Sequence, residues 1–459
     1  MQVPPSLVNS LKNVKGFDEE AFLQVHGAAI PLTSIRINPQ KINASSIASI
    51  FEDNIIDNVS WSSNGYYLKT RPSFTLDPLF HAGAYYVQEA SSMFLEEALK
   101  QAVTTDQPIK VLDLCAAPGG KSTLIQSLIS SNSLLVSNEV IKTRVNILAE
   151  NITKWGSANV IVTNNDPKDF QRLPGYFDVI VVDAPCSGSG LFRKDPQAIN
   201  EWSEQNVQLC SQRQQRILAD VMPSLKPGGV LIYSTCSYSL EEDEDICDWL
   251  MDNYALSGIQ YEVKNEWHII KTFSKKSNVP GYRFYPDKLK GEGFFIAAFR
   301  KDGDEDEGNI IKVKAKTEKP TAAEIENVKP FLKENESLFF IKQNGEILAM
   351  PLHLENDFNI IRSALYLKKA GVKLGTVIRN ELIPDHELAI SAIIATGIPS
   401  LKVDKETALQ YLRKQEIKIG NMDKGWVLIK YNQLPLGWVK VLPNRVNNYY
   451  PKDWRILNK

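Results

Sequence analysis

Short apolar runs alternate with longer amphipathic segments from about residue 110 to residue 301. The apolar runs include IKVLDLCA, SLLVSNEV, ANVIVTNND, FDVIVVDAPC and GGVLIYSTCS. This alternation is typical of βαβ units, in which helices connect parallel strands and cover both faces of the sheet. The later run GEGFFIAAFRK, at 291–301, predicts a closing strand. The sequence therefore predicts an α/β fold with a doubly wound, mostly parallel sheet.

A glycine-rich loop, CAAPGGKS at 115–122, follows the first apolar run. Ligands of doubly wound sheets bind beyond the carboxyl ends of the strands, where this loop is placed. Its glycines let the backbone approach a ligand closely, and a helix beginning near Lys121 offers free N–H groups. A Walker A loop needs glycine where Cys115 stands, and the G-x-G-x-x-G pattern is absent. The loop thus predicts binding of a polar ligand, without nucleotide hydrolysis.

Carboxylates end the next three predicted strands. Glu139 follows the second strand, where an acidic side chain can accept hydrogen bonds from both hydroxyls of a ribose. Asp166 follows the third strand and is placed for an adenine amino group, and Asp183 follows the fourth. Together they predict a nucleoside-binding crevice. Metal binding is the alternative, but no histidine lies near any of the three in sequence, so we expect no metal.

Two cysteines, Cys186 and Cys236, stand at the ends of the fourth and fifth apolar runs. A thiol becomes a nucleophile when its surroundings favour the thiolate and leave it accessible, and strand ends of such a sheet can supply both conditions. Ordinary core packing is the alternative, because free cysteine is among the most buried residue types. Cys210 and Cys247 fall inside predicted helices, where we expect core packing alone.

Composition and length bound the class of protein. The 459 residues suggest about three domains. The five cysteines form no CxxC pair, which argues against a disulfide framework or structural zinc and favours a reducing cytoplasm. The N-terminus lacks the pattern of a secretory signal, and no apolar run approaches the roughly 18 residues of a membrane span. We expect a cytoplasmic protein that does not cross a membrane.

The charge distribution confines any nucleic-acid contact to local surfaces. The chain has 52 basic and 54 acidic side chains, so its net charge of −2 gives no global signal for nucleic acid. Residues 412–459 carry ten Lys or Arg against three Asp or Glu, interleaved with Trp and Tyr. This tail is either an RNA-contacting patch or a small β domain with an aromatic core. The segment SIRINPQKIN, at 34–43, is a second candidate for phosphate contact.

Four motifs resemble the signatures of one enzyme family. VLDLCAAPGGKST, DVIVVDAPCSGSG, FRKDP and YSTCSYS are similar to those of the Sun/Nop (RsmB/NSUN) family of S-adenosylmethionine-dependent RNA cytosine-C5 methyltransferases. HAGAYYVQEASSM, at 81–93, resembles the segment before that family's catalytic core, and its His81 is the one histidine that we consider a candidate for RNA contact. The ending, from WVLIKYNQL onward, resembles the PUA-like tail of its bacterial RsmF (YebU) branch, whose members modify small-subunit (16S) ribosomal RNA. Asp287 departs from the pattern, because many relatives carry His there.

The resemblance implies a Rossmann-like class I methyltransferase core between an N-terminal α+β extension and a C-terminal PUA-like β domain. The expected divisions are an RNA-binding extension at 1–75, the methyltransferase core at 76–301, a charged linker at 302–320, an intermediate domain at 321–385 and a PUA-like RNA-binding domain at 386–459. It further implies a partner, ribosomal RNA or the small ribosomal subunit, and we expect a monomer. An RNA-binding assembly factor without catalysis and a transfer RNA methyltransferase remain alternatives.

The resemblance also assigns catalytic roles that the residues alone leave open, since both cysteines end strands at one crevice. It makes Cys236 the nucleophile that adds to carbon 6 of cytosine, so that carbon 5 can attack the methyl group. Asp183 would donate to or pair with N3 of the base, and Cys186 would assist the final elimination. The implied S-adenosylmethionine site comprises Cys115, Ala116, Ala117, Pro118, Gly119, Gly120, Lys121, Glu139, Asp166 and Asp183.

Overall fold

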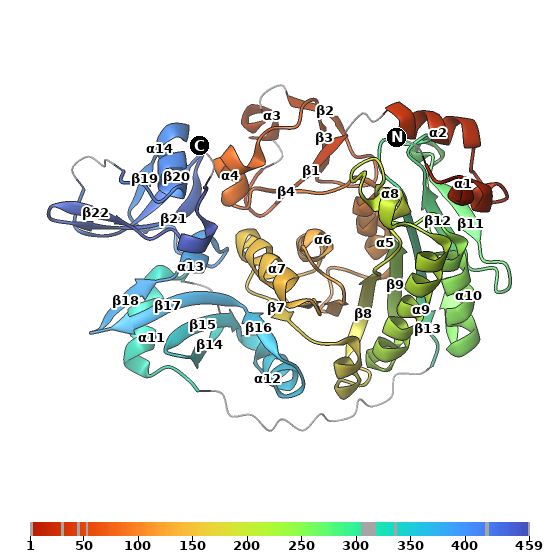
Figure 1. The fold of residues 1–459 in the computed structure, drawn as a ribbon. Helices are drawn as coiled ribbons and strands as arrows, with labels where there is room; N and C mark the ends of the chain where they lie inside the picture. Colours follow the sequence, from red (N-terminus) through yellow and green to blue (C-terminus); the bar gives the residue numbers. More distant parts are fainter. Residues whose placement is uncertain are drawn as a thin grey trace.

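A central sheet organises the computed structural model, which describes residues 3–28, 32–43, 46–51, 54–303, 318–334, 337–417 and 422–457. Parallel strands occupy its middle, and antiparallel strands lie at both sides (Figure 1). The sheet order is β11 (Ile270–Phe273), β12 (Pro280–Phe284), β13 (Phe294–Lys301), β9 (Leu225–Thr235), β8 (Phe177–Asp183), β5 (Lys110–Asp113), β6 (Leu134–Asn138), β7 (Val160–Thr163) and β16 (Leu367–Ala370), and β10 (Leu256–Gly258) pairs with β13. The predicted doubly wound α/β core is confirmed.

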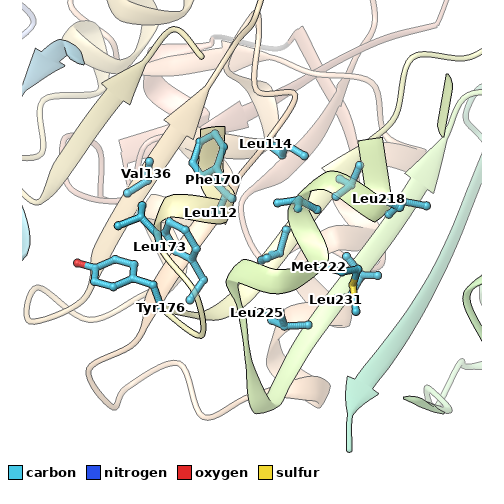
Figure 2. Close-up of a cluster of buried hydrophobic side chains, with 14 of the residues drawn as sticks. Leu112, Leu114, Val136, Phe170, Leu173, Tyr176, Leu218, Met222, Leu225 and Leu231 are labelled. Atoms are coloured by element: carbon cyan, nitrogen blue, oxygen red, sulfur yellow. The ribbon is translucent and has the colours of Figure 1, made fainter. Parts of the chain in front are cut away.

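Alternating side chains bury both faces of this sheet. Val111 and Val179 belong to one buried cluster and Leu112 and Ile180 to another, because successive strand residues point to opposite faces. The first face carries α5 (Leu95–Ala102), α6 (Gly120–Leu128) and α7 (Lys142–Trp155), and the second carries α9 (Glu204–Val221), preceded by α8 (Ala198–Glu201), and α10 (Glu244–Asn253). Figure 2 shows part of the second cluster. Buried parallel strands explain the near-continuous apolar runs of the sequence.

The N-terminal region is α+β, as predicted. Its sheet has the order β2 (Ile55–Asn58), β3 (Gly65–Leu68), β1 (Thr33–Ile37) and β4 (Tyr85–Val87), with helices α1 (Pro5–Leu11), α2 (Glu19–Ala28), α3 (Ile47–Ile50) and α4 (Pro78–His81). All five residues of β1 are buried. The expectation that SIRINPQKIN contacts RNA phosphates is therefore wrong for Arg36, which is 1% exposed. Hydrogen bonds inside the protein occupy its guanidinium instead.

The intermediate region builds its own sheet and also extends the central one. Its sheet has the order β14 (Leu338–Gln343), β15 (Glu346–Pro351), β17 (Val372–Ile378) and β18 (Glu381–Pro384), with helices α11 (Ala322–Val328) and α12 (Glu355–Ala364). Strand β16 pairs antiparallel with β7 at the edge of the central sheet. Most of the predicted charged linker, residues 304–317, lies outside the described residues.

The C-terminal region is a small sheet packed with helices. Its strands have the order β19 (Ser400–Lys402), β20 (Gly425–Tyr431), β21 (Leu434–Leu442) and β22 (Arg445–Asn448), and its helices are α13 (His386–Ile390) and α14 (Lys405–Leu412). Trp438 and Tyr450 are completely buried, which favours the aromatic-core interpretation for these two residues. Lys452 and Arg455 are exposed. Within the described residues, no helix combines the length and apolarity that a membrane span requires.

Candidate active site

The glycine-rich loop connects β5 to the start of α6. Gly119 caps this helix with φ of +115°, a left-handed conformation that favours glycine. Arg36 reaches the same helix from β1, donating to Thr123 Oγ1 at 2.6 Å and to the Gly120 carbonyl at 3.2 Å. The N-terminal sheet thus holds the start of α6 through a buried cation. Apart from the presence of an arginine, nothing in the sequence indicated this contact.

Glu139 lies buried at the end of β6, beside the glycine-rich loop. Its Oε1 accepts from the Ile141 N–H at 2.9 Å, and its Oε2 lies 3.6 Å from Arg144 Nη1. Arg144 also donates to the Ala117 carbonyl at 2.7 Å. The guanidinium therefore joins the carboxylate to the loop, whereas the sequence of α7 did not distinguish such a role from a solvent-facing arginine.

Two further carboxylates lie at strand ends of this edge of the sheet, Asp166 after β7 and Asp113 at the end of β5. Asp166 follows β7, where its Oδ1 accepts from the Lys168 N–H at 3.2 Å and caps a short helix. Asp113, inside the apolar run of β5, was missed because its neighbours are hydrophobic. Burial raises the pKa of Asp113 to about 7, while Ser122 donates to its Oδ2 at 2.6 Å and favours the charged form.

Cys186 and Cys236 lie in direct contact in the loops after β8 and β9. Their sulfur atoms are 2.9 Å apart, and both cysteines are free and partly exposed. The pKa of Cys186 is raised well above its ordinary value, first by the hydrogen bond with Cys236, then by burial and by the charge of Cys236. Either sulfur can be the donor in this contact, and the raised pKa favours the protonated form of Cys186.

Asp183 is paired with Lys121 at the end of β8. Lys121 Nζ lies 2.7 Å from Asp183 Oδ2, and Ser234 Oγ donates to Oδ1 at 2.9 Å. The same ammonium lies 5.2 Å from the centre of the Phe294 ring. Lys121 therefore contacts the carboxylate at the end of β8, the strand that precedes Cys186, although the sequence interpretation grouped this lysine with the cofactor loop. Its assignment to the cofactor stays a prediction.

Glycine backbones bring the loops around the thiols into contact. Gly190 N–H donates to the Cys236 carbonyl at 2.8 Å, and Gly293 N–H donates to the Gly190 carbonyl at 3.1 Å. A Cβ atom on Gly190 would lie 2.7 Å from the Cys236 oxygen, closer than real contacts allow. The glycines of SGSG and GEGFF thus permit three loops to meet at the nucleophile candidate.

The other three cysteines and His81 do not contribute to the thiol pair of Cys186 and Cys236. Burial raises the pKa of Cys115, while Cys210 and Cys247 are buried in α9 and α10, as predicted for core residues. His81 is 7% exposed, and its Nε2 lies 2.9 Å from the Thr75 carbonyl, so an approach to RNA is wrong for it. Among the described residues, no three His, Cys, Asp or Glu side chains are grouped to hold a metal ion.

The donor set at the strand ends fits S-adenosylmethionine. The first turn of α6 presents backbone N–H groups, since a helix leaves its first four without intrahelical partners. The buried Glu139 carboxylate lies at the next strand end, where a ribose diol of a nucleoside ligand binds in folds of this kind. Asp166 and Asp183 end the flanking strands. Their individual roles toward the cofactor remain predictions.

Three family models match successive parts of the chain. "16S rRNA methyltransferase RsmB/F" matches residues 101–300, and "N-terminal domain of 16S rRNA methyltransferase RsmF" matches residues 3–90. "Methyltransferase RsmF PUA domain" matches residues 399–456. Ribosomal RNA small subunit methyltransferase F of Shewanella piezotolerans is 30% identical over 438 residues, which are 92% of this chain and 90% of that protein. The chain belongs to this family.

Further relatives support both the family and the fold. Ribosomal RNA small subunit methyltransferase F of Pectobacterium atrosepticum is 27% identical over 442 residues, covering 92% of this chain and 89% of that one. A methyltransferase homologue from Pyrococcus horikoshii, 28% identical, superposes with a TM-score of 0.53 over 65% of this chain and all of that one. NSun6 from the same organism, solved with SFG, shares the fold at 20% identity and a TM-score of 0.55, covering 66% and 99%. The predicted family and class I methyltransferase fold are confirmed.

Proposed function

We propose that the protein methylates carbon 5 of cytosine in small-subunit ribosomal RNA through a covalent bond between Cys236 and carbon 6 of the base. Family membership makes it an S-adenosylmethionine-dependent RNA methyltransferase. The observation that carries the cytosine chemistry is the contact between two thiols, 2.9 Å apart, in the loops that follow β8 and β9, while Asp183 at the end of β8 pairs with Lys121. Methylation of a hydroxyl or an exocyclic amine would require neither thiol.

The two thiols have different roles in the reaction: Cys236 forms the bond to the base, and Cys186 assists its cleavage. The Cys236 thiolate adds to carbon 6, forming an S–C bond and opening the C5=C6 double bond, so that charge moves through the ring toward N3 and carbon 5 becomes nucleophilic. S-adenosylmethionine, when bound, supplies the electrophilic methyl group that carbon 5 takes. Transfer of the carbon 5 proton to a water molecule then restores the C5=C6 double bond and expels the Cys236 thiolate. Cys186 can stabilise that leaving thiolate through its S–H, since the two sulfur atoms already lie 2.9 Å apart.

The Lys121–Asp183 pair supports the charge that develops on the base. Asp183 accepts from Ser234 and from the Lys121 ammonium, so a proton of Lys121 lies within one hydrogen bond of the carboxylate. We infer that a proton passes from Lys121 through Asp183 to N3 as Cys236 adds, and returns when the thiolate leaves. An interaction that stabilises charge present only in the transition state increases kcat and has little effect on the affinity for the substrate.

The substrate and its surroundings follow from the domains around the core. A base undergoing ring chemistry must come from a single strand or be flipped out of a helix, so other domains must position the RNA. We propose ribosomal RNA or the small ribosomal subunit as partner, a cytoplasmic location, and a monomer as the active state. The division of the chain into RNA-binding ends and a catalytic centre is part of this proposal.

Bisulfite sequencing tests the proposed function directly. Small-subunit ribosomal RNA is compared between cells that have the gene, lack it, or carry a Cys236→Ala copy. We expect at least one cytosine to be protected only in the first. If every cytosine reacts identically in the three strains, the ribosomal assignment falls. Repeating the sequencing on transfer RNA separates the transferase alternative, and unchanged RNA of both kinds would favour the non-catalytic assembly factor.

A further inference from the structure

Glu242 is a completely buried carboxylate between the loops of the two thiols. It belongs to the acidic run EEDED at 241–245. Its Oε1 accepts from the Ser187 N–H at 2.8 Å. Its Oε2 accepts from Ser187 Oγ at 2.5 Å and from Ser237 Oγ at 2.6 Å. One carboxylate therefore joins the residue after Cys186 to the residue after Cys236.

The same carboxylate is held in place by helix α9. Gln214 Nε2 donates to Glu242 Oε1 at 3.2 Å and to the Pro185 carbonyl at 3.0 Å. Burial by itself raises the pKa of Glu242, whereas the donors from Ser187, Ser237 and Gln214 favour its ionised form. Burying a carboxylate costs free energy unless donors surround it, so four hydrogen bonds on two oxygens define a specific arrangement.

The backbone around Glu242 is anchored to the sheet. Tyr233 on β9 donates its hydroxyl to the Glu242 carbonyl at 2.7 Å. Thr235 donates to Asp243 Oδ1 at 2.6 Å, and Arg283 on β12 pairs with Asp243 at 3.1 Å and also with Glu244. The link between the two thiol loops is consequently attached to rigid strands rather than to a mobile surface segment.

We propose that Glu242 is a positioning residue that holds the Cys186 and Cys236 loops in register and keeps the shared proton on Cys186. The proposal rests on the methylation chemistry described above. The negative charge of Glu242 is one of the influences that raise the pKa of Cys186, after the hydrogen bond with Cys236, burial and the charge of Cys236. A protonated Cys186 leaves Cys236 as the available thiolate and preserves the S–H that assists elimination.

Kinetics of two Glu242 variants test the positioning role. Glu242→Gln keeps the size but removes the charge and one acceptor oxygen, and Glu242→Asp keeps the charge on a shorter stem. The matched control is Asp245→Asn, which removes an exposed carboxylate from the same acidic run. We expect Glu242→Gln to lower kcat by about tenfold or more, with KM for RNA unchanged, because small displacements of reacting groups cost rate rather than binding. Glu242→Asp should recover part of that loss.

Alkylation of Cys186 by iodoacetamide, followed across pH by peptide mass spectrometry, tests the charge effect without any methylation. We expect the midpoint for Cys186 to move to lower pH in Glu242→Gln and to stay near the wild-type midpoint in Glu242→Asp. This readout stands even if the RNA substrate proves to be different. A Glu242→Gln profile that coincides with wild type, or a kcat within about twofold of the Asp245→Asn enzyme, would overturn the proposal.

Serine variants keep the proposal testable if Glu242→Gln does not fold. Ser187→Ala removes one hydroxyl donor and Ser237→Ala removes the other, while Glu242 remains in place. We expect each to lower kcat and the double variant to lower it by less than the product of the two effects, because both act through one carboxylate. Unchanged kcat in both single variants would show that the carboxylate does not position the thiol loops.

Discussion

The carboxyl edge of the central sheet and the C-terminal region place their distinctive residues in opposite ways. At the sheet edge, Cys186 and Cys236 come from different strands, 50 residues apart, and meet in an accessible cluster. In the C-terminal region, Trp438 and Tyr450 turn inward and pack in the core. The type of a residue therefore does not determine whether its side chain is exposed. The two regions differ in their topology, which places the cysteines at strand ends but sets no such position for the aromatic residues.

Parallel topology makes the first arrangement predictable. Strands β8 and β9 are adjacent and parallel, so the residues that follow them emerge at the same edge. The aromatic tail has no such constraint, because alternation along β20 and β21 is compatible with either a stacking surface or a core. Trp438 packs against Phe331 and Trp426 with ring centres 5.9 and 6.4 Å away, and its indole N–H donates to the Asp385 carbonyl at 2.9 Å.

The largest predicted effect comes from removing either thiol. Cys236→Ala should form no RNA adduct and no product, because the bond to carbon 6 cannot form. Cys186→Ala should accumulate a protein–RNA complex that survives denaturation, because the leaving thiolate loses its hydrogen-bond donor. The measurement is a denaturing gel with labelled RNA, with and without S-adenosylmethionine.

The buried Cys210 provides the matched control, since Cys210→Ala removes a thiol from α9 away from the pair. It should retain turnover and accumulate no adduct. If the phenotypes of Cys186→Ala and Cys236→Ala are reversed, the nucleophile assignment must be exchanged. Adducts from both variants would contradict the division of labour between the two sulfurs.

Trp438→Ala should cost stability rather than chemistry. Truncating a completely buried aromatic residue typically lowers the free energy of unfolding by about 3–5 kcal/mol. Chemical denaturation followed by intrinsic fluorescence measures the loss, and adduct formation at low temperature should persist in the folded fraction. An unchanged free energy of unfolding together with weaker RNA binding would restore the stacking-surface interpretation for Trp438.

The sequence predicted the architecture of the core and the positions of its strand-end residues. Apolar runs, glycine-rich turns and strand-end motifs all concern short segments whose neighbours are set by βαβ topology. Long-range partners were not predictable in this way. Arg36 contacts α6 from 84 residues away, and Glu242 contacts Ser187 from 55 residues away. In sequence, both are ordinary charged residues.

Two interpretations failed for a shared physical reason. Arg36 and His81 were candidates for RNA contact because polar side chains in such segments are usually exposed. Each is instead buried with partners supplied by other parts of the fold, Gln88 and Thr123 for Arg36 and the Thr75 carbonyl for His81. Burial of a polar group depends on whether distant segments satisfy it, which composition does not reveal.

Lys121 tests where the catalytic cluster ends and the cofactor site begins. Because its ammonium lies on Asp183, Lys121→Gln should lower kcat by about 100-fold, in the range of general acid–base catalysis, while the Kd for S-adenosylmethionine changes little. Single-turnover methylation and equilibrium cofactor binding measure the two effects separately. Lys154→Gln, on α7, is a control that changes a lysine paired with Glu150 outside the cluster. A rise in the cofactor Kd that accounts for the entire rate loss would place Lys121 in the cofactor site.

The smallest expected effect concerns the exposed cations beside the aromatic core. Lys452 and Arg455 are exposed, and both lie close enough to lower the pKa of Lys414, after the larger effect of burial, so three positive charges gather there. Replacing Lys452 and Arg455 by Glu should weaken RNA binding by about tenfold at low salt and flatten its salt dependence, because phosphate contacts release counterions. The free energy of unfolding should stay within about 0.5 kcal/mol of wild type, as for most surface substitutions. If the RNA affinity and its salt dependence do not change, the RNA-binding surface must lie outside these two residues of the C-terminal region. The expected loss would show that the exposed cations of this region bind RNA phosphates, while its buried aromatic residues only stabilise the fold.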